Sequence, residues 1–159
     1  MFNRRWISWL AAMLGALVLA TGSAWAEGKQ KVVYHINGDN AKQQLGALRN
    51  IQNHINAIGK DQLDLKVVLH GNGLSLLLDP SAVDEVKGFS QGNANDTMAA
   101  SIDALRNQGV QFQVCNNTVV GRKVDVDRHL YNVRKDDIVP SGVAQLAILQ
   151  GQGYAYIKP

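Results

Sequence analysis

Residues 65–73 read LKVVLHGNG, and this stretch decides the fold class. Its first part, LKVVL, is a short and mostly apolar run, which is consistent with a strand that is buried on both faces. The turn formers that follow, beginning with His70 and Gly71, end the run. Strands buried on both faces are typical of a parallel sheet that is covered by helices on both sides. The stretch therefore predicts that strands and helices alternate along the chain.

The residues before this stretch predict a strand and a helix. Residues 31–36, KVVYHI, are rich in β-branched side chains and end at the turn formers Asn37-Gly38-Asp39. From Ala41 onward, apolar residues recur at spacings of three and four, which places them on one helical face. These residues are Leu45, Leu48, Ile51, Ile55 and Ile58. Gly59 can adopt the left-handed conformation that ends many helices, so the helix is expected to stop there.

The same alternation continues after the stretch. We expect a helical turn over 74–78, a surface loop over 88–96, and a helix marked by Met98, Ile102 and Leu105. A strand with Val110, Phe112 and Val114 then leads into Cys115, Ser141 caps a helix with the sequence GVAQLAILQ, and a last strand reads YAYI. Four strands separated by helices predict a three-layer α/β fold, with a mostly parallel sheet of about four to five strands and helices on both faces.

The first 26 residues have the pattern of a cleavable secretory signal peptide. A basic start at Arg4-Arg5 precedes an apolar run from about Ile7 to Ala20, and Ala24-Trp25-Ala26 is a small-residue cleavage site. The apolar run is shorter than the ~20 residues that a membrane-spanning helix needs. We therefore expect export, no membrane association after cleavage, and one α/β domain over residues 27–159.

Composition limits the partners and the covalent bonds of this domain. The predicted leader holds two of the 16 basic side chains and none of the 13 acidic ones, so the rest of the chain has a net charge of only +1. Without a basic face or an aromatic platform, nucleic acid is not an expected partner. Cys115 is the only cysteine, so no disulfide within the chain can stabilise the fold and packing alone must hold it together.

Polar residues follow three of the predicted strands. Ligands of open α/β sheets bind beyond the carboxyl ends of the strands, so these residues are expected to share one edge. A helix predicted to begin near Thr118 would direct backbone N–H groups at Cys115, and Arg122, one turn further on, would add positive charge. Both effects favour a thiolate, so Cys115 is the predicted reactive residue. The candidate pocket residues are Asn37, His70, Asn72, Asn116, Asn117, Thr118 and Arg122.

Other interpretations of these residues stay open. A lone cysteine at the end of an apolar strand is also typical of a small buried hydrophobic residue, and His70 is better explained as a hydrogen-bonded loop histidine than as a base. His35 is expected to be buried or interfacial, and His54 and His129 to be solvated. The four histidines and Cys115 lack close metal-ligand spacing, so no metal site is predicted. No cofactor is predicted either.

Several stretches taken together resemble one protein family. In order, they are KVVYHINGD, NIQNHINAIG, VVLHGNGLSLLL, GVQFQVCNNT and VPSGVAQLAILQGQGYAYIKP, and they span about residues 30–159. In this combination the chain resembles the DsrE family, specifically its exported single-domain branch. The resemblance implies a flavodoxin-like fold and assembly into homotrimers or hexamers. Together with the leader, it implies a periplasmic location.

The resemblance also implies a role for the cysteine. In some relatives a cysteine after the third core strand carries sulfur as a persulfide, and Cys115 matches that position. Some relatives have a second cysteine three positions later, where this chain has Thr118, so a dithiol cycle within one chain is not expected. The expected function is a sulfur carrier or transferase that exchanges sulfane sulfur with donor and acceptor proteins or with small polysulfides. The alternatives are a non-catalytic module that binds a small anion or a partner, and a single-thiol redox sensor.

Overall fold

The computed structural model describes residues 28–159, and the predicted signal peptide lies outside them. Within this range five strands form one sheet in the order β4-β3-β2-β1-β5, and every neighbouring pair is parallel. The strands are β1 (Gln30–Ile36), β2 (Leu63–Leu69), β3 (Gln111–Cys115), β4 (Ile138–Val139) and β5 (Ala155–Ile157). The α/β fold with a parallel sheet, expected from the sequence, is confirmed.

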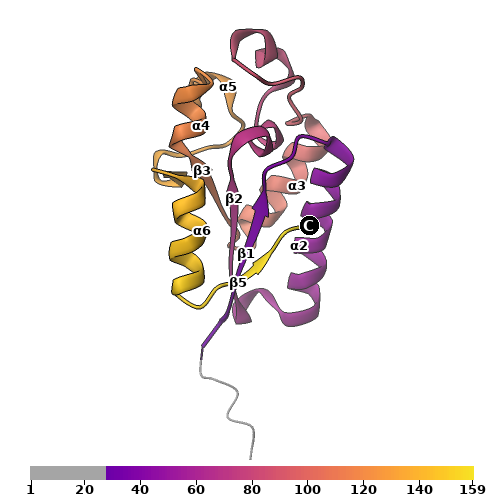
Figure 1. The fold of residues 1–159 in the computed structure, drawn as a ribbon. Coiled ribbons are helices and arrows are strands. Elements are labelled where there is room, and N and C mark those ends of the chain that lie inside the picture. Colours follow the sequence, from indigo (N-terminus) through magenta and orange to yellow (C-terminus); the bar gives the residue numbers. More distant parts are fainter. Residues whose placement is uncertain (1–27) are drawn as a thin grey trace, which may run out of the picture.

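Helices cover both faces of the sheet. Figure 1 shows the sheet nearly edge-on, with α2 and α3 on one side and α4 and α6 on the other. The α-helices are α2 (Ala41–Ile58), α3 (Asp96–Asn107), α4 (Asn116–Gly121), α5 (Val126–His129) and α6 (Gly142–Gly151), and the 3-10 helices are η1 (Lys60–Gln62), η2 (Gly71–Leu76), η3 (Pro80–Glu85) and η4 (Lys135–Asp137). Across residues 28–159, none of these helices combines the length and the apolar character that crossing a bilayer requires.

The helix ends follow the signals in the sequence. The side chain of Asn40 accepts a hydrogen bond from the Gln43 N–H (3.0 Å) and caps α2, which ends at Gly59 with φ +92°. Asn95 caps α3 in the same way, through the Met98 N–H at 3.1 Å. The Oγ of Ser141 accepts from the Ala144 N–H at 3.4 Å and starts α6 as expected. Local capping chemistry therefore determines where these three helices begin.

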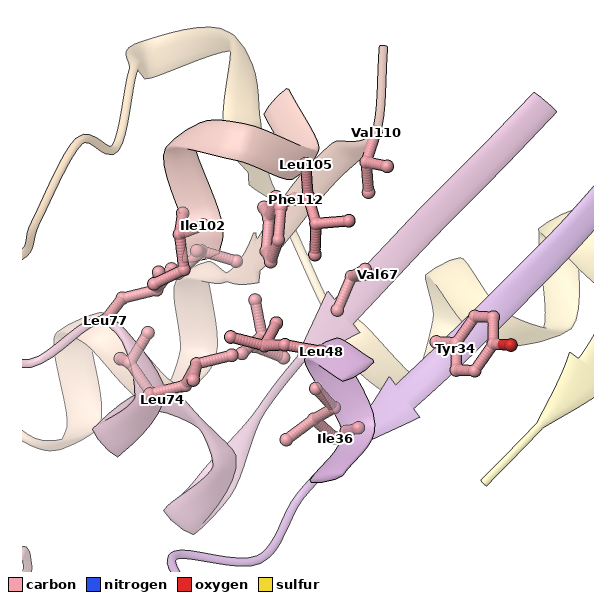
Figure 2. Close-up of a cluster of buried hydrophobic side chains, with 14 of the residues drawn as sticks. Tyr34, Ile36, Leu48, Val67, Leu74, Leu77, Ile102, Leu105, Val110 and Phe112 are labelled. Carbon is pink, nitrogen blue, oxygen red and sulfur yellow. The ribbon is translucent and has the colours of Figure 1, made fainter. Parts of the chain in front are cut away.

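The two faces of the sheet carry cores of different size. The larger core lies between the sheet and helices α2 and α3, where Leu48, Ile102 and Phe112 are almost completely buried (Figure 2). The smaller core lies beneath α6. It consists of Val33, Val68, Leu146, Leu149 and Tyr154. The side of the molecule that carries α6 is thus the more thinly covered one.

A buried polar cluster holds the loop that follows β1. Gln44 donates from Nε2 to the Gly38 carbonyl (2.8 Å) and to Ser75 Oγ (2.9 Å). Asn93 donates from Nδ2 to the Asp39 carbonyl and to Gln44 Oε1, both at 2.8 Å. Buried carbonyl groups need such donors because they have lost their water. The cluster thus pins the carboxyl end of β1.

Several local expectations were wrong. The 88–96 loop is not wholly on the surface, because Asn93 in the cluster just described is only 4 % exposed. His129 was expected in solvent but is buried, with Nδ1 accepting from the Asp125 N–H at 3.1 Å. His54 is half-buried and shares a hydrogen bond of 3.2 Å with the Tyr34 hydroxyl. The two-residue strand β4 was missed because it is too short to show a period.

Candidate functional site

Three residues that bear reactive chemistry lie on one face at the carboxyl edge of the sheet. His35 is paired in register with Val68, and Val68 is paired with Gln113. Side chains two positions apart along a strand point to the same face. His70 and Cys115, two positions beyond Val68 and Gln113, therefore lie on the same face as His35. Val33 and Val68 pack there against α6, so this is the α6 face.

The first residue of α6 packs directly against the thiol. A Cβ atom at Gly142 would lie 2.9 Å from the Cβ of His70 and 3.2 Å from the Cβ of Cys115. Only glycine lets the helix approach this closely, because real Cβ atoms do not come within 3.0 Å of a neighbour. His70 and Cys115 thus both pack against Gly142. Cys115 is only 5 % exposed.

Four hydrogen-bond donors surround the sulfur of Cys115. Burial raises the pKa of the thiol, but hydrogen bonds from the Gly142 N–H, the Thr118 hydroxyl and the Thr118 and Asn117 N–H groups outweigh burial and lower the pKa below its ordinary value. The hydroxyl oxygen of Thr118 accepts from the Gly71 N–H at 2.9 Å. The hydroxyl proton of Thr118 is therefore free to point at the sulfur. This arrangement stabilises a thiolate although the residue is buried.

The other predicted pocket residues lie elsewhere. Arg122 donates from Nη2 to Asn72 Oδ1 (2.6 Å) and from Nη1 to the Gly88 carbonyl (2.7 Å). Asn72 in turn donates to Asp39 Oδ2 at 3.3 Å. The guanidinium group of Arg122 is thus held at the surface, and it is not among the groups that lower the pKa of Cys115. The helix α4 begins at Asn116, directly after Cys115, so only the backbone of Asn117, and not its exposed side chain, reaches the sulfur.

Two histidines share a direct hydrogen bond beside the thiol. The Nε2 atoms of His35 and His70 are 2.7 Å apart, and His35 Nδ1 is 2.6 Å from the hydroxyl oxygen of Tyr156. The ring centroids are 4.7 Å apart with 22° between the planes. The distance between the ring centroids is longer than the distance between the two Nε2 atoms by nearly the sum of the two ring radii. The nitrogens therefore point at each other, edge to edge, as an N–H···N bond requires.

Both rings of this pair are neutral at pH 7. Burial, followed by repulsion from Lys158 and from His70 when that ring is protonated, lowers the pKa of His35 to about 4. Burial and then the charge of Lys158 lower the pKa of His70 as well. His70 is therefore a neutral hydrogen-bonding group rather than a cation beside Cys115. His35 lies on β1, His70 directly follows β2, Tyr156 lies on β5 and Lys158 directly follows β5.

A cavity of about 160 Å³ opens at the end of β1, beside the first turns of α2. Asn37, the remaining predicted pocket residue, lines this cavity with His35 and Lys158, whereas Cys115 does not. Among residues 28–159, no three or more His, Cys, Asp or Glu side chains are grouped to hold a metal ion.

Sequence reasoning missed Gly142, Tyr156 and Lys158. Nothing in their local sequence marks them, because each reaches the site only through the folded sheet.

These features define a parallel α/β protein with a hydrogen-bonded thiol at the carboxyl edge of its sheet. The sequence profile of the DsrE/DsrF-like family matches residues 29–159, and the chain belongs to this family. The protein of unknown function MTH1491 from Methanobacterium thermoautotrophicum has a similar structure, with a TM-score of 0.63 and 26 % identity over 82 % of this chain and 100 % of that one.

The ychN protein from E. coli shares the fold, with a TM-score of 0.58 and 17 % identity over 82 % of this chain and 99 % of that one. A comparison with curated protein sequences gives no match.

Proposed function

We propose that the protein accepts and passes on sulfane sulfur through Cys115. The observation that carries this proposal is the position of Cys115 at the carboxyl end of β3, against the first residue of α6, where hydrogen-bond donors of Gly142, Thr118 and Asn117 lower the pKa of the thiol. Such donors stabilise an anionic sulfur, which is the state that a thiol needs to react. Membership of the DsrE/DsrF-like family implies a protein of the sulfur-relay type, which agrees with this chemistry.

The proposed uptake step is an exchange at sulfur. The Cys115 thiolate attacks an outer sulfur of a polysulfide and forms a new S–S bond with its electron pair. The S–S bond of the polysulfide breaks, and the shortened polysulfide leaves as an anion with the electrons of that bond. An acceptor thiolate then takes the outer sulfur in the same way and restores the Cys115 thiolate. No oxidant or reductant is consumed.

A single cysteine suits a carrier. A second thiol nearby would attack the persulfide and discharge it as a disulfide. The chain has only Cys115, and Thr118 stands one helical turn further on. In place of a second thiol, Thr118 contributes a hydrogen bond to the sulfur.

The burial of Cys115 also favours a second candidate function. Cys115 is 5 % exposed, and the first turn of α6 and His70 pack beside it, so a movement of either group would open access to the sulfur. If neither moves, Cys115 is a packed residue in a module that binds a small anion or a partner protein. The two candidates differ in whether the folded protein can gain sulfur.

We expect the folded protein to gain the mass of one sulfur atom on exposure to sodium polysulfide, and to lose it on treatment with a reductant. Intact-mass analysis measures both changes. The Thr118→Val variant should gain sulfur about tenfold more slowly below the pKa of the thiol, since a hydrogen bond to a charged group contributes about 1.5 kcal/mol. Cys115→Ser is the control and should gain nothing.

A protein that gains no sulfur while its fold is intact would contradict the carrier function and favour the binding module. A species with twice the mass that disappears on reduction would instead identify the single-thiol redox sensor.

We further propose that the protein is exported to the periplasm and assembles there into homotrimers or hexamers. Residues 1–26 support export. The exposed apolar side chains Val143 and Ile148 of α6 support assembly, because such residues in one region are typical of an interaction surface. The protein in a periplasmic extract should begin at Glu27 and sediment at three or six times the chain mass. An N-terminus at Met1 would contradict export, and a monomer would contradict assembly.

A further inference from the structure

Arg122, which directly follows α4, joins three segments of the chain at the surface. Its guanidinium group donates from Nη2 to Asn72 Oδ1 (2.6 Å) and from Nη1 to the Gly88 carbonyl (2.7 Å). The same group lies over the ring of Phe89, 4.2 Å from the ring centroid. The backbone carbonyl of Arg122 accepts from the Lys87 N–H at 2.8 Å. A planar guanidinium suits this place, because it can stack on a ring while its N–H groups donate in the plane.

The segment that Arg122 holds through Asn72 also contacts Thr118. Gly71 and Asn72 are the first two residues of η2, and the Gly71 N–H donates to Thr118 Oγ1 at 2.9 Å. The Arg122 N–H donates to the Thr118 carbonyl at 3.0 Å, so the two residues lie one helical turn apart. On its other side, Asn72 donates from Nδ2 to Asp39 Oδ2 at 3.3 Å. The start of η2 is therefore tied to α4 at two neighbouring points.

The contact with Gly71 decides where the hydroxyl proton of Thr118 points. A threonine hydroxyl can rotate, and it carries one proton and two acceptor positions. The Gly71 N–H occupies an acceptor position, while the proton is donated to the sulfur of Cys115. Gly71 has φ +55°, a conformation that glycine adopts more readily than other residues. The direction of its N–H thus depends on the exact path of the chain at the start of η2.

We propose that Arg122 is a positioning residue for Cys115: it holds the start of η2 in place, where the Gly71 N–H directs the Thr118 hydroxyl at the sulfur. The guanidinium charge itself is not among the groups that act on the thiol. Arg122 therefore acts by position and not by charge. The inference deepens the proposed function and rests on it for one consequence, the rate of sulfur uptake, which follows the reactivity of the thiol.

Replacing Arg122 with lysine separates position from charge. Arg122→Lys keeps the positive charge but loses the fork and the flat face that the contacts need. The loosened Thr118 hydroxyl should then stabilise the thiolate less, so the midpoint of the pH profile of Cys115 alkylation should rise. We expect a rise of about half a pH unit, compared with about one unit for Thr118→Val, in which the hydroxyl is absent. Arg122→Met should shift the midpoint as far as Arg122→Lys.

The link through Asn72 is tested by a double-variant cycle. Asn72→Ala removes the acceptor and should raise the midpoint as much as Arg122→Lys does. The combined variant should raise it no further, because both changes break the same link. Lys123→Met is the matched control, since it removes a positive charge from an exposed residue next to Arg122, and it should leave the midpoint in place. Urea unfolding checks that each variant is folded, and a merely structural role would lower stability without moving the midpoint.

The last step, from η2 to the sulfur, is tested in the Thr118→Val background. There Arg122→Lys should no longer move the midpoint, because the hydroxyl that the start of η2 directs is missing. A shift of the same size with and without the Thr118 hydroxyl would overturn the route through this group.

The remaining outcomes are equally decisive. A midpoint that rises in Arg122→Met but not in Arg122→Lys would assign the effect to charge and overturn the positioning role, as would unchanged midpoints in both. A protein with the expected midpoints that gains no sulfur from polysulfide would overturn the proposed function and leave the positioning role standing. Unchanged midpoints in a protein that does gain sulfur would do the opposite.

Discussion

Replacing Gly73 with alanine is expected to lower the free energy of unfolding by about 3 kcal/mol or more, the range of severe overpacking. The new Cβ would lie 2.0 Å from the carbonyl oxygen of Ile36 and 2.8 Å from the Cα of Asn37. These are backbone atoms at the end of β1, and they cannot rotate away as a side chain would. The loop after β1 would have to move, and with it the carbonyl groups that Gln44 and Asn93 bind.

Urea unfolding of the two proteins measures this change. Gly46→Ala is the matched control, because Gly46 lies within α2 with no atom near the position of its Cβ. That variant should be neutral or more stable by up to about 1 kcal/mol, since alanine favours helices. If Gly73→Ala unfolds within 1 kcal/mol of the parent protein, the close approach of η2 to β1 is wrong.

Replacing Gly142 with alanine is expected to shift the pH profile of Cys115 alkylation upward and to slow sulfur uptake about tenfold or more below the pKa of the thiol. The added Cβ would meet the Cβ atoms of His70 and Cys115 at 2.9 and 3.2 Å. The first turn of α6 must therefore move outward, which lengthens the hydrogen bond from the Gly142 N–H to the sulfur. Losing a donor to a charged group costs about 1.5 kcal/mol, which corresponds to about tenfold.

The direction of the shift follows from the sign of the interaction. This donor lowers the pKa of Cys115, so its loss raises the pKa and moves the midpoint of the profile to higher pH. The maximal rate at high pH separately reports access to the sulfur. Gly151→Ala, at the other end of α6 with open space around it, is the control and should leave the midpoint in place. The same midpoint in Gly142→Ala would show that the N–H of Gly142 does not act on the thiol.

The sequence alone was sufficient for the fold class, for both ends of α2 and for the start of α6. The period of the apolar residues, the stop at Gly59 and the cap Ser141 are local signals, and they act over a few residues. The position of Cys115 at the carboxyl edge also followed, because parallel strands all end at the same edge of a sheet. Each of these conclusions depends on residues that are close together in the chain.

The environment of Cys115 was decided only by the tertiary structure. Arg122 follows Cys115 closely in sequence, yet it binds Asn72 and Gly88, whereas Gly142 from a later helix supplies a donor to the sulfur. His35 and Tyr156 are 121 positions apart and meet because β5 pairs with β1. Strand order and helix packing bring such residues together, and both depend on how the whole chain buries its apolar surface. No local pattern in the sequence carries that information.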